Sequence, residues 1–155
     1  MPIQFTRVAA QKFSVDFKQR IVTVYRNFPE LDRVIICGCI SRGSRLLGAA
    51  QSWTNPQKIS LQPGVANTVI AHELVHLLQG DGIPHGEKQC DVWTVARLDK
   101  ELLDSKPHYI LYGWTADRWH RNKDAAKQLC IQAIEYRRSN RNYIVWLSEE
   151  LKRLK

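Results

Sequence analysis

The chain has 155 residues, of which 44% are hydrophobic and 25% charged, so it is long enough for one domain with a real core and is not intrinsically disordered. No run approaches the roughly 18 apolar residues of a membrane span, and residues 1–7 lack the apolar core of a signal peptide. We therefore expect a soluble, cytoplasmic protein with a single domain over residues 1–155 and no membrane partner. Its net charge is +8.

Apolar periodicity predicts one helix and three strands in the N-terminal part of the chain. Ser14 is a typical N-cap, and the apolar positions that follow it share one face of a helix that extends to about residue 27. Phe28-Pro29 ends this helix. Three short apolar runs at residues 33–40, 45–53 and 58–61, separated by turn residues, indicate strands of a small antiparallel or mixed sheet.

Helical patterns dominate the rest of the chain. One begins after Pro63-Gly64 and is closed by Gly80-Asp81-Gly82, and a second runs from about residue 87 to 103. Two more are expected at about 123–137 and 142–155. The sequence therefore predicts an α+β fold in which the helix after residue 64 packs on a three- or four-stranded sheet and the C-terminal region is helical.

The helix after residue 64 contains the pattern HExxH, formed by His72, Glu73 and His76. Because an α-helix has 3.6 residues per turn, the two imidazoles lie one above the other and can bind one metal ion together. Glu73 lies beside them, where its carboxylate can take a proton from a water molecule and later deliver it to a leaving amine. This spacing is typical of Zn²⁺ sites that hydrolyse peptide bonds.

The residues around this motif favour a buried helix. Apart from the motif residues, the segment from Thr68 to Leu78 contains only uncharged, mostly apolar residues. Burying two imidazoles and a carboxylate without partners would be costly, and a metal ion supplies the missing partner. We therefore predict His72 and His76 as Zn²⁺ ligands and Glu73 as the catalytic base.

A catalytic zinc ion needs a third protein ligand, and three candidates follow the motif. His85 comes first because neutral imidazole is the commonest zinc partner. Glu87 is the next choice and Asp91 the third; they lie one turn apart on the following helix and reach the level of His76 and His72 if the two helices pair antiparallel. The spacing alone does not choose among the three.

The region from about residue 34 to 98 resembles the zincin metallopeptidases. His85-Gly86 after HExxH is similar to the step that supplies a third histidine in SprT-like and WLM-type proteases, although Glu87 to Cys90 stands where those families have an aromatic residue. The run from Glu87 to Asp91 instead resembles the ExxxD pattern of gluzincins, in which the Glu binds zinc and the Asp supports a ligand. Gln79 replaces the glycine of the metzincin motif and excludes that group. The resemblance implies a zinc metallopeptidase with a strand along its active-site cleft.

Other candidate residues lie outside the motif. Residues 121–155 have nine Lys or Arg and four Asp or Glu, so this basic C-terminal extension is a candidate nucleic-acid partner site. The oxyanion of a peptidase transition state needs a hydrogen-bond donor, for which the candidates are His108, Tyr109, Tyr112 and His120. The cysteines form no CxxC pair, and we expect reduced, mostly buried thiols at Cys37, Cys39, Cys90 and Cys130.

The motif and its surroundings thus favour a zinc-dependent metalloprotease that acts on protein or peptide substrates. Two alternatives stay open: a nucleic-acid-associated protein acting near DNA, and a non-catalytic zinc-binding module. The presence of Glu73 argues against the last, because a structural metal site gains nothing obvious from a general base beside the ion.

Overall fold

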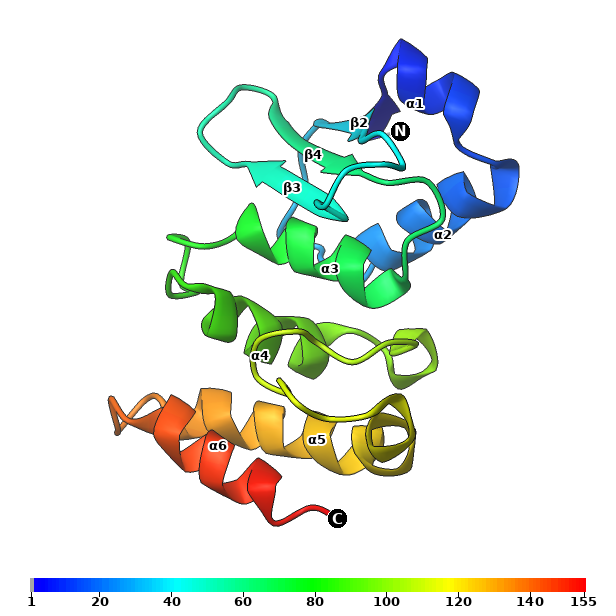
Figure 1. Ribbon diagram of the computed structural model, residues 1–155. Helices are drawn as coiled ribbons and strands as arrows, with labels where there is room; N and C mark the ends of the chain where they lie inside the picture. The colour runs from blue at the N-terminus through cyan, green and yellow to red at the C-terminus, as the bar shows by residue number, and fades with distance from the viewer. Residues whose placement is uncertain (1) are drawn as a thin grey trace.

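The computed structural model describes residues 2–155 and shows an α+β fold in which the elements are stacked nearly in chain order (Figure 1). The sheet forms one end, α3 lies beneath it, and α4, α5 and α6 follow, each in contact with the one before. The elements of residues 2–155 are β1 (Ile3–Phe5), α1 (Arg7–Lys12), α2 (Val15–Tyr25), β2 (Ile35–Cys39), β3 (Gly48–Gln51), β4 (Gln57–Leu61), α3 (Asn67–His76), α4 (Glu87–Arg97), the short 3₁₀ helix Lys100–Leu102, α5 (Ala116–Tyr136) and α6 (Tyr143–Lys152).

The sheet has four strands in the order β1-β2-β4-β3 among the described residues, and it is mixed. β1, β2 and β4 run parallel, with Ile3 beside Ile35 and Ile35 beside Gln57. β3 runs antiparallel to β4, with Gly48 beside Leu61, and it forms one edge of the sheet. A mixed sheet of four strands confirms the predicted fold class in its coarse form.

The inner face of the sheet is apolar and packs on the helices. Ile35 and Cys37 of β2 and Ile59 and Leu61 of β4 are fully buried, and they alternate with half-buried or small residues, as expected for strands covered on one side. α3 contacts β3, β4 and α2, so the helix carrying HExxH lies directly under the edge strand (Figure 1).

Contacts from distant residues fix the start of α3. Its N-cap residue, Ala66, has no side chain that could accept a hydrogen bond. Asp104 takes this role: its carboxylate accepts from the backbone N–H of Asn67 at 2.9 Å and of Thr68 at 3.2 Å. A negative charge at a helix N-terminus is also favoured by the helix dipole. The Arg20 guanidinium donates to Asn67 at 2.8 Å and further ties α3 to α2.

The predicted elements are largely confirmed, with differences at their ends. The Ser14 side chain caps α2 by accepting from the Phe17 N–H, as predicted. β1 and α1 were not expected, because a three-residue parallel strand and a six-residue helix are too short to show a period. The helix predicted to reach residue 103 ends at Arg97, where the Lys127 ammonium donates to three carbonyls of its last turn and C-cap. α5 starts at Ala116, earlier than predicted, because Thr115 caps it.

Two further findings concern the whole of the described chain. No helix within residues 2–155 is both long and apolar enough to cross a membrane. The four cysteines are free thiols, as predicted: Cys37, Cys90 and Cys130 are buried, and Cys39 is half-buried.

Candidate metal centre

α3 places the two histidines of the motif side by side. Their rings are 4.6 Å apart between centroids and nearly perpendicular, and the Nε2 atoms of His72 and His76 are separated by 3.0 Å. Both side chains are mostly buried, with exposed fractions of 15% and 21%. The helical spacing of the motif therefore directs two imidazole nitrogens toward one point.

The first residue of α4 completes a triangle with these nitrogens. One oxygen of Glu87 lies 3.1 Å from Nε2 of His72, and the other lies 3.2 Å from Nε2 of His76. In a zinc tetrahedron with ligands at about 2.0–2.2 Å, neighbouring ligand atoms are about 3.3–3.6 Å apart. The distance between the two Nε2 atoms and their distances to the two different oxygens of Glu87 are slightly shorter than that. Two imidazoles with one carboxylate are a known catalytic zinc set. The donor set therefore fits a zinc ion.

Asp91 lies behind His72 and does not face the triangle. Its Oδ1 is 2.8 Å from Nδ1 of His72, while its Oδ2 accepts from the backbone N–H groups of Tyr109 and Ile110 at 2.7 and 3.1 Å. A carboxylate can only accept, so Nδ1 of His72 carries a proton, and in the neutral imidazole Nε2 then presents its lone pair. Burial lowers the pKa of His72, but the hydrogen bond to Asp91 and the nearby carboxylates raise it more, so the net pKa is raised.

Gln79 orients the second histidine in the same way. Its Oε1 lies 2.7 Å from Nδ1 of His76, and its amide nitrogen donates to the carbonyls of Pro84 and Gly86 at 3.0 and 2.9 Å. The two carbonyl partners require the NH₂ group on that side, so the amide oxygen faces His76 and accepts from its Nδ1–H. Both imidazoles therefore turn Nε2 toward Glu87.

Cys90 also lies near the histidines. The ligand atoms of His72, His76 and Cys90 all fall within 4.8 Å of one another, a grouping that is compatible with a metal. The Cys90 thiol, however, lies 3.1 Å from the backbone carbonyl of His72 and is fully buried. Burial raises the pKa of this thiol well above its ordinary value. Its geometry is that of a thiol hydrogen-bonded to α3.

His85, the first choice from the sequence for the third ligand, has a different position. It is exposed, and its Nε2 lies 3.6 Å from where a side-chain carbon on Gly80 would sit. It lines the same hollow as His76 and Glu87, but Glu87 is the residue whose oxygens lie within 3.2 Å of both Nε2 atoms. The structure thus brings together His72, His76 and Glu87, with Asp91 behind them and His85 at the side.

Glu73, the predicted base, lies in a niche formed by the edge strand. It is 7% exposed, and a side-chain carbon on Gly48 would lie 2.7 Å from its Cγ and Oε1. Only glycine at position 48 lets this carboxylate lie against β3. Burial raises the pKa of Glu73 above its ordinary value, although the two histidines oppose this shift. A raised pKa makes the carboxylate a better proton acceptor near neutral pH.

Two hollows meet at Glu73 and form a groove along β3. One has a volume of about 430 Å³ and extends toward Arg45, Leu47 and Lys106. The other, of about 370 Å³, extends along Ala49 and Ala50 to Trp53. Both are lined by Leu46, Gly48, Glu73 and Tyr109.

Large apolar side chains are exposed along this groove. Leu46, Leu47, Trp53 and Tyr109 have exposed fractions of 59, 53, 77 and 42%. Exposed apolar side chains around a hollow are typical of a binding site.

Tyr109 lines both hollows of the groove together with Glu73. Its ring stacks on that of His72, with 5.9 Å between the two ring centroids. Loss of solvent and the neighbouring Glu87 carboxylate raise the pKa of Tyr109, so its hydroxyl stays a donor. Of the other oxyanion candidates, His108 lines one hollow, while Tyr112 and His120 line neither.

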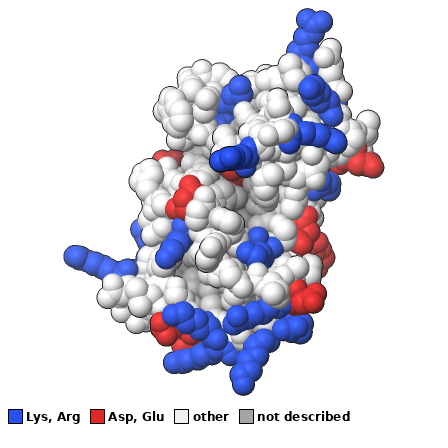
Figure 2. Space-filling model, in the orientation of Figure 1, with Lys and Arg blue, Asp and Glu red and all other residues white. Residues whose placement is uncertain are grey.

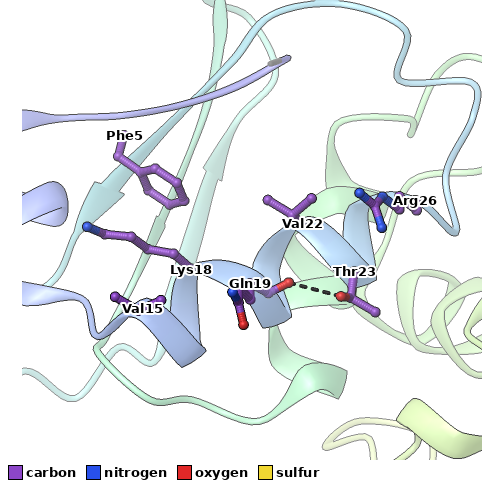
Figure 3. A pocket seen from close by; sticks show the side chains of 7 residues that line it. All are labelled: Phe5, Val15, Lys18, Gln19, Val22, Thr23 and Arg26. Carbon is purple, nitrogen blue, oxygen red and sulfur yellow. Dashed lines mark hydrogen bonds between the residues drawn. The ribbon is translucent and has the colours of Figure 1, made fainter.

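A further pocket, of about 550 Å³, lies between β1 and the outer side of α2 (Figure 3). Figure 3 shows the Lys18 side chain running beside the Phe5 ring, with a hydrogen bond from Thr23 to the Gln19 carbonyl. None of its seven lining residues is His, Cys, Asp or Glu. This pocket has no imidazole, thiol or carboxylate that could bind a metal ion, whereas the groove along β3 has several, so the groove is the candidate site.

Comparisons with family models, with curated proteins and with solved structures found no match to this chain. The functional assignment therefore rests on the geometry of the groove.

Two residues of this centre were not expected from the sequence in the roles that they have here. Gln79 was considered only as a departure from the metzincin motif, and its position three residues after His76, one helical turn away, is the signal that could have indicated its role. Gly48 had no such signal, because its contact with Glu73 joins residues 25 positions apart in the chain.

Proposed function

We propose that the protein is a zinc-dependent peptidase of the zincin type, in which His72, His76 and Glu87 hold the metal. The observation that carries this proposal is the meeting of two Nε2 atoms and one carboxylate within 3.2 Å, beside a buried Glu73. A bound zinc ion would polarise the peptide carbonyl and lower the pKa of the attacking water.

The residues of the chain account for the proton transfers. Glu73 takes a proton from the attacking water and delivers it to the nitrogen of the leaving amine, and its raised pKa suits both steps. The hydroxyl of Tyr109, which lines the same groove, donates to the oxygen that becomes negative in the transition state. Asp91 and Gln79 hold the two imidazoles in the orientation that the metal requires.

β3 gives the substrate its direction. As the edge strand, it has backbone N–H and C=O groups on its outer side that an extended peptide can pair with. The groove runs on both sides of Glu73 along this strand, so a polypeptide can pass through it. This arrangement favours cleavage within a peptide chain and supports the zincin-like interpretation of α3 and β3.

The test combines metal analysis with hydrolysis of an unfolded protein substrate. The wild-type protein should bind one zinc ion and cleave the substrate. Glu73→Gln should retain the zinc and lose about 10³-fold or more in kcat, because the base is absent while the ligands remain. Equal activity of the two zinc-loaded proteins would refute Glu73 as the base, and absence of zinc from both would refute the metal centre.

We also propose, as a second candidate function, that the basic C-terminal helices bind nucleic acid. Figure 2 shows Lys and Arg side chains gathered at the end of the molecule formed by α5 and α6.

Removing residues 121–155 is a poor test of nucleic-acid binding, because α5 buries Cys130 and Ala133 and packs on α4. Replacing the exposed Arg121, Arg138 and Arg141 with Gln should instead weaken binding to a DNA duplex and reduce the slope of its salt dependence by about one unit for each phosphate that is no longer neutralised. Absence of duplex binding at low salt by the wild-type protein would exclude this candidate.

A further inference from the structure

The two ends of the groove differ in charge. The hollow beside the start of β3 is lined by Arg45, Lys106 and His108. The hollow beside the end of β3 has no Lys or Arg among its twelve lining residues, and Trp53, Ala49 and Ala50 form much of its wall. Figure 2 shows the face of the molecule hollowed between the sheet and the helical half, with Lys or Arg side chains bordering the hollow.

Two carboxylates, Asp91 and Glu73, also line the basic end. Asp91 accepts three hydrogen bonds, from His72 and from the backbone of Tyr109 and Ile110. Glu73 lies in the niche beside Gly48. Neither acid forms an ion pair with Arg45 or Lys106.

The two cationic side chains are not paired with any acid in residues 2–155. The Lys106 ammonium is half-buried and has one long contact, 3.5 Å to the Leu111 carbonyl, while Arg45 is exposed. Neither takes part in an ion pair within that range. Two cationic groups lining one hollow of about 430 Å³ favour a ligand that carries negative charge.

The direction of β3 tells which part of a substrate meets these cations. β3 runs from Gly48 to Gln51, and its start lies next to Arg45. An extended peptide that pairs antiparallel with β3 runs the opposite way, so its N-terminal part lies near Trp53. The residues that follow the cleaved bond then lie in the hollow with Arg45 and Lys106.

We propose that Arg45 and Lys106 form a subsite for a carboxylate on the C-terminal side of the cleaved bond. This proposal rests on the peptidase function proposed above. The carboxylate is either an Asp or Glu side chain or the free C-terminus of a short peptide, since both present the same charged group to the two cations.

The test compares three peptides that share one sequence. The first has Gln after the cleaved bond and an amidated C-terminus, the second has Glu at that position, and the third keeps Gln but ends in a free carboxylate two residues later. With the zinc-loaded wild-type protein, kcat/KM should be about tenfold higher for at least one carboxylate peptide than for the first, as expected for a charge pair in a partly shielded hollow. The ratios of the second and third peptides tell whether the side chain or the terminus is recognised.

Two variants connect this preference to the proposed residues. In Arg45→Gln/Lys106→Gln the ratio should fall to about one, while Arg42→Gln, an exposed arginine of the same loop that lines neither hollow, should keep the wild-type ratio. A wild-type ratio of one for both carboxylate peptides, or a ratio that survives the double substitution, would overturn the subsite.

Binding to Glu73→Gln separates this proposal from the peptidase function. The Kd values of the three fluorescently labelled peptides, measured by anisotropy, should show the same preference and the same dependence on Arg45 and Lys106. If the wild-type protein cleaves nothing but this binding preference is present, the peptidase function is wrong and the subsite stands. If the three peptides bind equally, the subsite is wrong whatever the activity.

Discussion

Replacing Glu87 with Gln should weaken zinc binding strongly, whereas replacing His85 with Gln should not. Gln keeps the size of the side chain but removes the negative charge that faces Nε2 of both His72 and His76 at 3.1 and 3.2 Å. His85→Gln is a matched control, because His85 is exposed, lines the same hollow and lies two residues away.

The expected magnitude follows from the number of ligands. Zinc sites with four protein ligands bind with about 10–16 kcal/mol, so one ligand contributes about 2.5–4 kcal/mol. Loss of the Glu87 oxygen from the triangle should therefore raise the Kd for zinc by about 10² to 10³-fold. His85→Gln should change it less than about threefold, because the atoms that meet at the triangle remain in place. Competition with a chromophoric chelator at fixed pH measures both values, and circular dichroism of the metal-free proteins checks that the fold is intact.

The same measurement of zinc affinity can refute the assignment of Glu87 as the third ligand. A large loss of affinity in His85→Gln with little change in Glu87→Gln would mean that the loop moves when zinc binds and that imidazole is the third ligand. A loss confined to Cys90→Ala would assign the third position to the thiol, which lies within 4.8 Å of both histidine ligand atoms. Either result would remove the present assignment of Glu87.

Three other predictions follow from single contacts. Gly48→Ala should lower kcat by about 10 to 100-fold without changing zinc affinity, since the new carbon would lie 2.7 Å from the Glu73 carboxylate and displace it; a kinetic and zinc-binding comparison with the wild type decides this. Asp104→Ala should lower the free energy of unfolding by about 1–2 kcal/mol in urea titrations, because α3 loses its N-terminal acceptor, and an unchanged midpoint would contradict that role. Burial raises the pKa of Cys37 to about 12, so this thiol should resist alkylation at pH 8 in the native protein and react on unfolding, as mass spectrometry of the labelled peptide can show.

The fold class and the motif helix could be predicted because their signals are local. The apolar positions around His72 and His76 recur with the helical period, and HExxH places both imidazoles on one side of any helix. Asn67 to His76 is helical and mostly buried, in agreement with that reasoning. The same holds for α2, whose Ser14 cap lies in its own first turn.

The spacing of residues in the sequence could not show that Glu87, rather than His85, lies beside the two histidines. Glu87 and His85 are two residues apart, and the turn between α3 and α4 decides which of them faces the histidines. Gly86, with a φ of 114°, turns the chain so that α4 begins at Glu87 with its carboxylate toward α3. The contacts of Gly48 with Glu73 and of Asp104 with α3 are also long-range, so no local pattern indicates them.

The hydrogen bonds behind the histidines give the strongest physical reason to expect a cation. Asp91 and Gln79 each bind an Nδ1–H, so in the neutral imidazoles both Nε2 atoms carry lone pairs, and these face each other at 3.0 Å beside the Glu87 carboxylate. Lone pairs and negative charge at such distances repel one another unless a positive charge lies among them. The pKa of His72 is raised for the same reason, because the nearby carboxylates favour a positive charge at this position, which a bound proton can also supply. Asp91 is itself fixed by two backbone N–H groups and Gln79 by two backbone carbonyls, so the arrangement does not relax by turning either imidazole away. A centre held this firmly in a repulsive geometry is stabilised when a cation binds, and we propose zinc because this donor set is one that zinc prefers.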